Sequence, residues 1–387
     1  MVKSKLTPDE AASAAQAAYS FKTTSNISEV FKERSLKELF SSAEESSERF
    51  KGKSGAFGFK TLIGFGVIAM GVGRFENHAL LACRGTKTFQ DVLTDINPAL
   101  RGTGSGSLVH SGFVRNFATF KDNIHRFITA NRPEVIHCVG HSLGGALATL
   151  SADSIIHSNQ AKQTVLYTFG CPRVGTHGFA SKLSSHSLLG VNNIHRVYHS
   201  NDPVAMFPLW PFVHAPVPRG ECYIGCEGFS LHPGKHSMNV YESSVEGKTW
   251  SDLRRPHPTW NSRHQDWVEA MERSGNSGLS LAKLSILNVA LNYMSRKVFK
   301  VTFTALQLGV MGVTTVLDQI SYMLDKAANM STENKGLVSK IVNFVLRICG
   351  QSARAIPTIT IATIYHAFRS LIKIAAGTAN LALNAAR

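Results

Sequence analysis

The stretch Gly140-His141-Ser142-Leu143-Gly144-Gly145 decides the fold of this chain. It follows an apolar, β-branched run at 135–139 and precedes an Ala/Leu-rich run at 146–150 that is typical of a buried helix. A strand, a sharp turn and a helix around one serine are the context that a G-x-S-x-G nucleophile elbow requires. The glycines leave room for a strained turn, and the Leu143 amide at the helix N-terminus points toward an oxyanion beside Ser142. The sequence therefore predicts a reactive serine at position 142.

Strand and helix patterns alternate around this elbow. Strand signals lie at 61–72, 79–83, 164–169 and 194–199, and helical patterns lie at 89–96, 114–131 and 146–157. Alternation of this kind predicts an α/β fold with a mostly parallel central sheet and helices on both faces.

A serine nucleophile needs a base, and the base needs a carboxylate that orients it. In the α/β-hydrolase order the carboxylate follows the serine and the histidine comes last. Asp202 lies just after the 194–199 strand, at the sheet edge where open α/β folds carry their chemistry. His236 and His264 each begin a segment that runs into a helix start. The residues alone leave these two histidines as alternatives for the base.

A second oxyanion donor is expected from a loop that follows an earlier strand. Arg84-Gly85-Thr86 ends the 79–83 strand, and Gly85 frees the backbone there. Thr86 offers both its amide and its hydroxyl, so we expect Thr86 and Leu143 to form the oxyanion hole. This constellation requires neither a metal nor a cofactor.

The chain divides into three parts by composition. Residues 1–58 read as an N-terminal helical segment, with Thr7 as cap and Pro8 in the first turn, followed by a turn-rich linker at 51–58. Residues 59–275 form the α/β-hydrolase domain, and 277–387 form an apolar, basic helical region. The N-terminus has no apolar segment of the secretory type, so we expect a cytoplasmic protein or one exported by a signal-independent route.

The C-terminal region is basic and rich in apolar residues. Between 279 and 387 it has three acidic residues against twelve lysines and arginines, and 301–317 carries no charge. Threonines and glycines make that stretch a poor membrane-spanning helix. Two alternatives remain, a self-packed helical bundle and a set of interfacial helices that lie on a membrane or act as a lid.

The formal net charge of +15 favours an anionic partner. No basic patch interleaved with aromatic residues and no nucleic-acid module is present, so we expect an anionic membrane surface rather than nucleic acid. Cys83, Cys138 and Cys171 fall in or after expected core strands and are interpreted as small buried hydrophobes. Cys222 and Cys226 have no second pair with zinc spacing and stay unassigned.

Five sequence blocks, in order, resemble the class 3 lipase family, the fungal-lipase-like branch of the α/β-hydrolases. They are the strand and oxyanion loop at 80–86, a W-x-x-D-like stretch at 91–96, H-x-G-F-like 109–113, T-F-G-x-P-R-V-G-like 168–175 and the aspartate strand at 196–204. Asp95 takes the acidic place of the second block, and no tryptophan precedes it, so the lid segment differs. The resemblance covers residues from about 60 to 245.

This resemblance implies a serine hydrolase with Ser142 as nucleophile, Asp202 as acid, and Thr86 and Leu143 as oxyanion donors. The H-S-M-x-x-Y pattern that begins at His236 is similar to the histidine block of many bacterial members, which favours His236 over His264. It implies hydrolysis of lipid carboxylic esters, of the lipase or phospholipase A type, at a lipid interface.

Three settings for this chain stay open. One is a bacterial lipase effector, and the second is a membrane-binding or delivery protein whose basic tail is the main functional part. The third is a soluble intracellular carboxylesterase. The partners that we expect are a lipid or phospholipid substrate and an anionic membrane surface, with protein partners unassigned.

Overall fold

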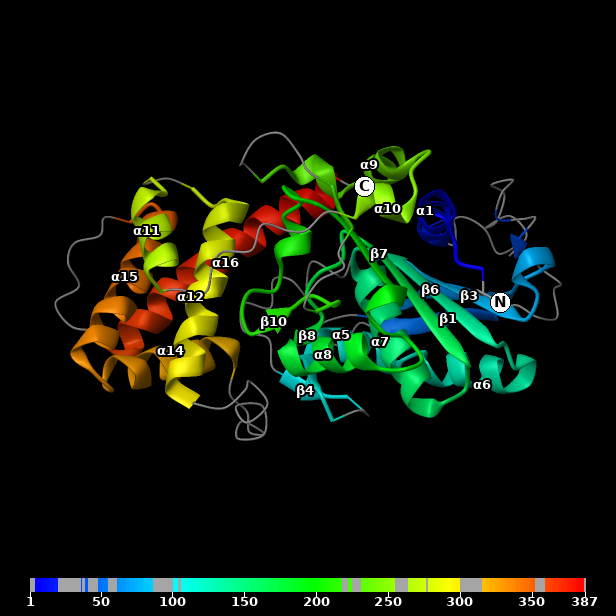
Figure 1. The fold of residues 1–387 in the computed structure, drawn as a ribbon, viewed down its shortest axis with the longest axis horizontal. Coiled ribbons are helices and arrows are strands. Elements are labelled where there is room, and N and C mark those ends of the chain that lie inside the picture. The colour runs from blue at the N-terminus through cyan, green and yellow to red at the C-terminus, as the bar shows by residue number, and fades with distance from the viewer. Residues whose placement is uncertain are drawn as a thin grey trace.

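The computed structural model describes two packed parts, a mixed sheet covered by helices and a C-terminal bundle of helices (Figure 1). It describes residues 4–19, 36, 39–40, 48–54, 61–85, 100–103, 106–217, 222–224, 231–254, 264–275, 278–299, 315–351 and 359–385.

The main sheet has seven strands in the order β1-β2-β3-β6-β7-β9-β11. Their bounds are β1 (Glu48–Ser54), β2 (Thr61–Met70), β3 (His78–Cys83), β6 (Val135–His141), β7 (Gln163–Phe169), β9 (Ile194–His199) and β11 (Cys222–Ile224). Strands β3 to β11 pair in parallel, whereas β1, β2 and β3 pair antiparallel. The predicted α/β-hydrolase class with a mostly parallel sheet is confirmed.

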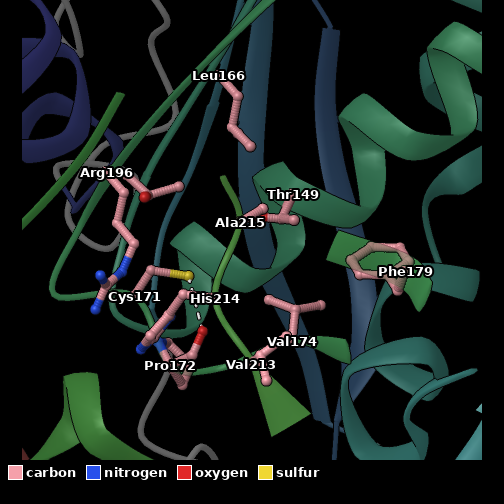
Figure 2. Close-up of a pocket in the computed structure, with 11 residues that line it drawn as sticks. Thr149, Leu166, Cys171, Pro172, Val174, Phe179, Arg196, Val213, His214 and Ala215 are labelled. Atoms are coloured by element: carbon pink, nitrogen blue, oxygen red, sulfur yellow. Dashed lines mark hydrogen bonds between the residues drawn. The ribbon is translucent and has the colours of Figure 1, made fainter. Parts of the chain in front are cut away.

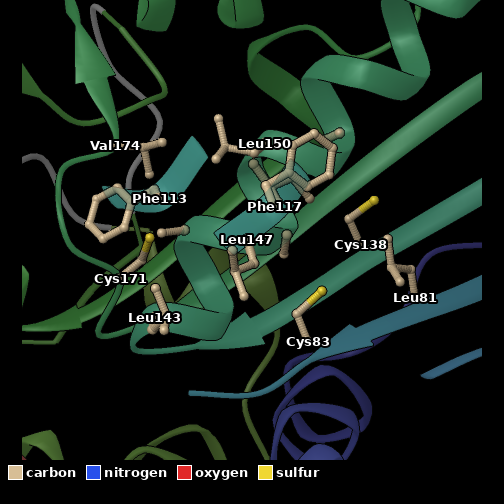
Figure 3. Packing of buried hydrophobic residues seen from close by; sticks show 14 of the residues in the cluster. Leu81, Cys83, Phe113, Phe117, Cys138, Leu143, Leu147, Leu150, Cys171 and Val174 are labelled. Carbon is tan, nitrogen blue, oxygen red and sulfur yellow. The ribbon is translucent and has the colours of Figure 1, made fainter. Parts of the chain in front are cut away.

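Both faces of the central strands are buried. Along β3 and β6, side chains alternate between two apolar clusters, so that Leu81 and Cys138 face one cluster while Leu80 and Val139 face the other. Helices α5 (Ser111–Ala118), α6 (Lys121–Asn131) and α7 (Leu143–Ser158) cover the first face (Figure 3). Helices α1 (Pro8–Ala17), α9 (Met238–Val245) and α10 (Trp250–Leu253) cover the second. Double burial explains why these strands are continuous apolar runs.

Three cysteines and the first helix agree with the predictions made from the sequence. Cys83, Cys138 and Cys171 are buried free cysteines, as predicted. Helix α1 begins with a capping box in which Thr7 accepts a hydrogen bond from the Glu10 amide.

The N-terminal segment departs from its prediction in one place. Residues 48–54, expected as the end of a helix and the start of a linker, form strand β1 and pair with β2. Pairing with a partner strand decides this conformation, and a single-segment pattern does not reveal such a partner. A second helix, expected from about residue 27 to residue 50 of the same segment, otherwise lies almost entirely outside the described residues.

Short elements surround the carboxyl edge of the sheet. A second, small sheet contains β4 (Leu100–Gly102), β5 (Leu108–His110), β8 (Gly175–Thr176) and β10 (Phe212–Val213). Helix α8 (His177–Ser185) follows β8. The single turns are η2 (Gly73–Phe75), η3 (Val191–Asn193), η4 (Val204–Met206) and η5 (Pro233–His236).

The C-terminal region forms a packed bundle. Its helices are α11 (His264–Arg273), α12 (Leu281–Phe299), α14 (Val316–Ala328), α15 (Thr332–Ile348) and α16 (Ile361–Ala385). They share one apolar core, which α11 joins although we expected its residues in the catalytic domain. Most of the uncharged 301–317 stretch lies outside the described residues. In the part of the chain that is described, no helix has the length and apolarity needed to cross a membrane.

Candidate active site

Ser142 occupies a strained turn between β6 and α7. Its φ of 59° and ψ of −131° lie in a region that side chains other than glycine seldom adopt, and strain of this kind clusters at functional sites. A Cβ on Gly140 would collide with the Gly144 carbonyl, and one on Gly144 would collide with the Cys83 carbonyl. The turn therefore requires both glycines.

Three buried side chains meet at this turn. The Ser142 hydroxyl lies 2.8 Å from His236 Nε2, and His236 Nδ1 lies 2.9 Å from Asp202 Oδ2. Asp202 follows β9, and His236 ends turn η5, so the carboxyl edge of the sheet brings them together. The structure thus joins the three residues that the sequence analysis chose as nucleophile, base and acid.

Asp202 is fully supplied with hydrogen-bond donors. Besides His236, the Tyr241 hydroxyl donates to Oδ2 at 2.7 Å, and the Val204 amide donates to Oδ1 at 2.8 Å. Burial raises the pKa of Asp202, but the electrostatic interaction with His236 and the three hydrogen-bond donors outweigh it, so the pKa lies below its usual value. Asp202 is therefore an anion at neutral pH. The carboxylate holds the His236 ring with Nδ1 protonated and Nε2 free to accept from Ser142.

A second histidine, His141, contacts the backbone of the base His236. His141 Nε2 lies 2.8 Å from the His236 carbonyl oxygen, and its Nδ1 lies 2.7 Å from the Tyr19 hydroxyl. Burial and the neighbouring His236 lower the pKa of His141 to about 3, so the ring is neutral. Its Nε2–H must then donate to the carbonyl, and its Nδ1 must accept from Tyr19.

The predicted oxyanion donors are described in part. Leu143 is the first residue of α7, so its amide is one of the N-terminal donors that have no partner within a helix. A Cβ built on Gly85, which ends the described loop after β3, would lie 3.4 Å from the Ser142 Cβ. That loop therefore approaches the serine. Thr86 itself lies outside the described residues.

The competing base and some supporting residues can also be placed. His264 begins α11, which packs against α12 and α15 of the bundle, whereas His236 occupies the position beside Ser142. Tyr241 is the last residue of the H-S-M-x-x-Y pattern that begins at His236, and it lies one helical turn into α9. Tyr19 had no signal in the sequence.

The site is closed in this conformation. Ser142 is 3% exposed, and His236 and Asp202 are fully buried. A small cavity beyond Cys171, lined by Arg196 and His214 among others, holds about 20 Å³ (Figure 2). That volume admits about one water molecule and no acyl chain. Among the described residues, no group of histidine, cysteine and carboxylate side chains is arranged to hold a metal ion.

Residues 80–212 match the class 3 lipase family. A secreted mono- and diacylglycerol lipase of Gibberella zeae is 32% identical over 139 residues, 32% of this chain and 32% of its own. A lipase of Caenorhabditis elegans is 30% identical over 167 residues, 40% of this chain and 45% of its own. The chain thus spans less than half the length of these curated relatives.

Solved structures give a weaker comparison. Lipase II from Rhizopus niveus is 19% identical, with 58% of this chain and 80% of that chain covered and a TM-score of 0.41. The evidence for the site therefore comes from its own geometry and from the sequence match. The resemblance to the class 3 lipase family that the sequence motifs indicated is confirmed over residues 80–212.

Proposed function

We propose that this protein is a serine hydrolase that cleaves carboxylic ester bonds of lipids. The observation that carries the proposal is the continuous hydrogen-bonded path from Ser142 through His236 to Asp202, with separations of 2.8 and 2.9 Å. This is the arrangement of a nucleophile, a general base and an orienting acid. The family match and the printed names of the relatives, which are lipases, support a lipid ester as substrate.

In the first half of the proposed reaction, His236 Nε2 takes the Ser142 proton while Oγ attacks the ester carbonyl. The carbonyl oxygen becomes an oxyanion beside the Leu143 amide, and the sequence analysis expects the second donor from Thr86. One such donor contributes about 10²- to 10³-fold to the rate. Asp202 stabilises the imidazolium that forms, and His236 then protonates the departing alcohol.

In the second half, water replaces the alcohol. His236 takes a proton from that water, the hydroxide oxygen attacks the acyl–Ser142 ester, and the acid product leaves with Ser142 reprotonated. Every proton passes through His236. The polar contacts that fix this ring, at Asp202 and at its own backbone carbonyl, therefore serve both halves of the reaction.

Within this class we favour anionic phospholipid surfaces as the setting, with the protein as a peripheral membrane enzyme. The net charge of +15 supports this choice, because a positive surface raises the local concentration of anionic lipid. Acylglycerols are the alternative that the names of the relatives support.

The test compares purified wild-type protein with Ser142→Ala on a mixed lipid extract, with products identified by mass spectrometry. We expect the wild type to release fatty acids and the corresponding lyso- or partial glycerides. Ser142→Ala is expected to lose at least about 10³-fold of that activity. Equal activity of the two proteins would end the proposed mechanism, and the lipid class that disappears identifies the substrate.

A further inference from the structure

Helix α16 belongs to both parts of the molecule. Its N-terminal half contributes large side chains to the bundle core, among them Ile364, Phe368 and Leu371. Its C-terminal half contributes mainly small ones, Ala375, Ala379 and Ala382, to the apolar core of the sheet domain, and Leu383 packs against the same core. In Figure 1 the helix runs from the bundle to the sheet domain. Large side chains therefore pack the N-terminal half of α16 into the bundle, whereas mainly alanines pack its C-terminal half against the sheet domain.

The part of the sheet domain that α16 touches is the catalytic edge. It packs against η5, the turn that ends in His236, and against η4, which begins two residues after Asp202. The inner face of α16 thus helps to cover a triad that solvent does not reach.

The outer face of the same helix is basic and apolar. Its exposed residues recur every three or four positions, at His366, Arg369, Lys373, Gly377 and Leu381. Of the six large apolar side chains that are exposed in the described chain, three lie on α16: Ile361, Ile374 and Leu381, at 48%, 38% and 62%. The helix has no acidic residue.

We propose that this outer face of α16 is the docking surface for an anionic phospholipid bilayer, and that docking draws the C-terminal half of α16 away from η5. The inference rests on the proposed lipid hydrolysis. Arg369 and Lys373 attract anionic headgroups, and Ile374 and Leu381 enter the acyl boundary beside them. Because the inner face is largely apolar as well, acyl chains can replace its contacts with the apolar core of the sheet domain. Docking and opening are then one event.

The docking step is tested with full-length protein in the Ser142→Ala background, so that the vesicles stay intact. Sedimentation is measured with phosphatidylcholine vesicles with and without phosphatidylglycerol. We expect binding only to the anionic vesicles, and an approximately tenfold or larger loss in Arg369→Glu/Lys373→Glu. Lys326→Glu/Lys335→Glu, on exposed positions of α14 and α15, changes the net charge equally and is expected to keep most of the binding. Equal losses in both double variants, or a loss in neither, would overturn the docking surface.

The opening step is tested by the rate at which a fluorophosphonate labels Ser142 in otherwise wild-type protein. We expect slow labelling in water and in neutral vesicles, with an acceleration of about tenfold or more on anionic vesicles. Arg369→Glu/Lys373→Glu is expected to lose this acceleration. Fast labelling without lipid would overturn the closed state, and an acceleration retained in the variant would overturn the role of α16. If Ser142 is never labelled, even in detergent, the proposed function fails instead, and sedimentation still decides the docking surface.

Discussion

Tyr19→Phe is the sharpest test of how the base is held. The change deletes one hydroxyl, which donates to His141 Nδ1 at 2.7 Å, and keeps the ring that packs beside it. His141 is then left with a buried, unsatisfied acceptor, which costs about 1–3 kcal/mol. Its other nitrogen orients the His236 carbonyl, so this energy bears on the position of the base. If all of it is expressed in the transition state, kcat falls by between about 5-fold and 150-fold.

The assay is hydrolysis of a short, monomeric ester together with urea unfolding. We expect kcat to fall and KM to change little, because Tyr19 is placed to act through His141 rather than on the substrate. Tyr322→Phe removes the same hydroxyl from a tyrosine that is 55% exposed, and it should shift stability by less than about 0.5 kcal/mol. In a His141→Gln background, Tyr19→Phe should have little further effect. A Tyr19→Phe protein whose kcat and unfolding match those of Tyr322→Phe would refute the relay.

Three further predictions concern the turn, the acid and the buried histidines. Gly144→Ala should abolish activity or folding because its Cβ meets the Cys83 carbonyl, whereas Gly336→Ala, in open space on α15, should stabilise the protein by about 0.5–1 kcal/mol in urea unfolding. Asp202→Asn should lower kcat about 10³- to 10⁴-fold. The pKa of Asp202 in the folded protein lies below its usual value. The ionised carboxylate therefore stabilises the folded state at pH values above the usual pKa, and this stabilisation is lost as the pH falls through the folded-state pKa. The unfolding curves of Asp202→Asn and wild type should accordingly converge in strong acid. Burial, together with the nearby His78, Arg74 and Lys5, lowers the pKa of His137 to about 3, so stability should fall as the pH drops from about 6.5 toward 3. His137→Phe should reduce that slope by at most about 1.4 kcal/mol per pH unit, and an unchanged slope would show that His137 is not the group that titrates.

Local chemistry explains what the sequence could predict. The elbow could be predicted because all its determinants are close in the sequence. The apolar β6 run comes first, and Gly140 and Gly144 follow where the backbone turns. Asp202 was found for a similar reason, since a strand end marks the edge where chemistry gathers. The choice of His236 required a family resemblance, because both candidate histidines precede helices. The three-dimensional position of η5 then places His236, rather than His264, beside Ser142.

Contacts between distant segments explain what the sequence could not predict. Strand β1 depends on β2 for its hydrogen bonds, and its own residues resemble a charged turn. Tyr19 lies 122 residues from His141, and no spacing rule joins an N-terminal tyrosine to an elbow. The alanines of α16 read as ordinary helix formers, although they pack in the core of another part of the chain.

The contacts on the two sides of η5 differ in kind, and that difference bears on how a closed site can open without losing its triad. On the sheet side, hydrogen bonds hold His236 at Nδ1 and at its carbonyl oxygen, through Asp202 and His141. On the other side lies α16, whose C-terminal half packs alanines and Leu383 against the apolar core of the sheet domain. Hydrogen bonds are directional and costly to break when buried, whereas apolar contacts are non-directional and acyl chains can replace them. Departure of α16 therefore leaves the base in its catalytic position. In the proposed mechanism, two features outside the matched 80–212 stretch thus have separate roles: Tyr19 holds the base through His141, and α16 admits the lipid.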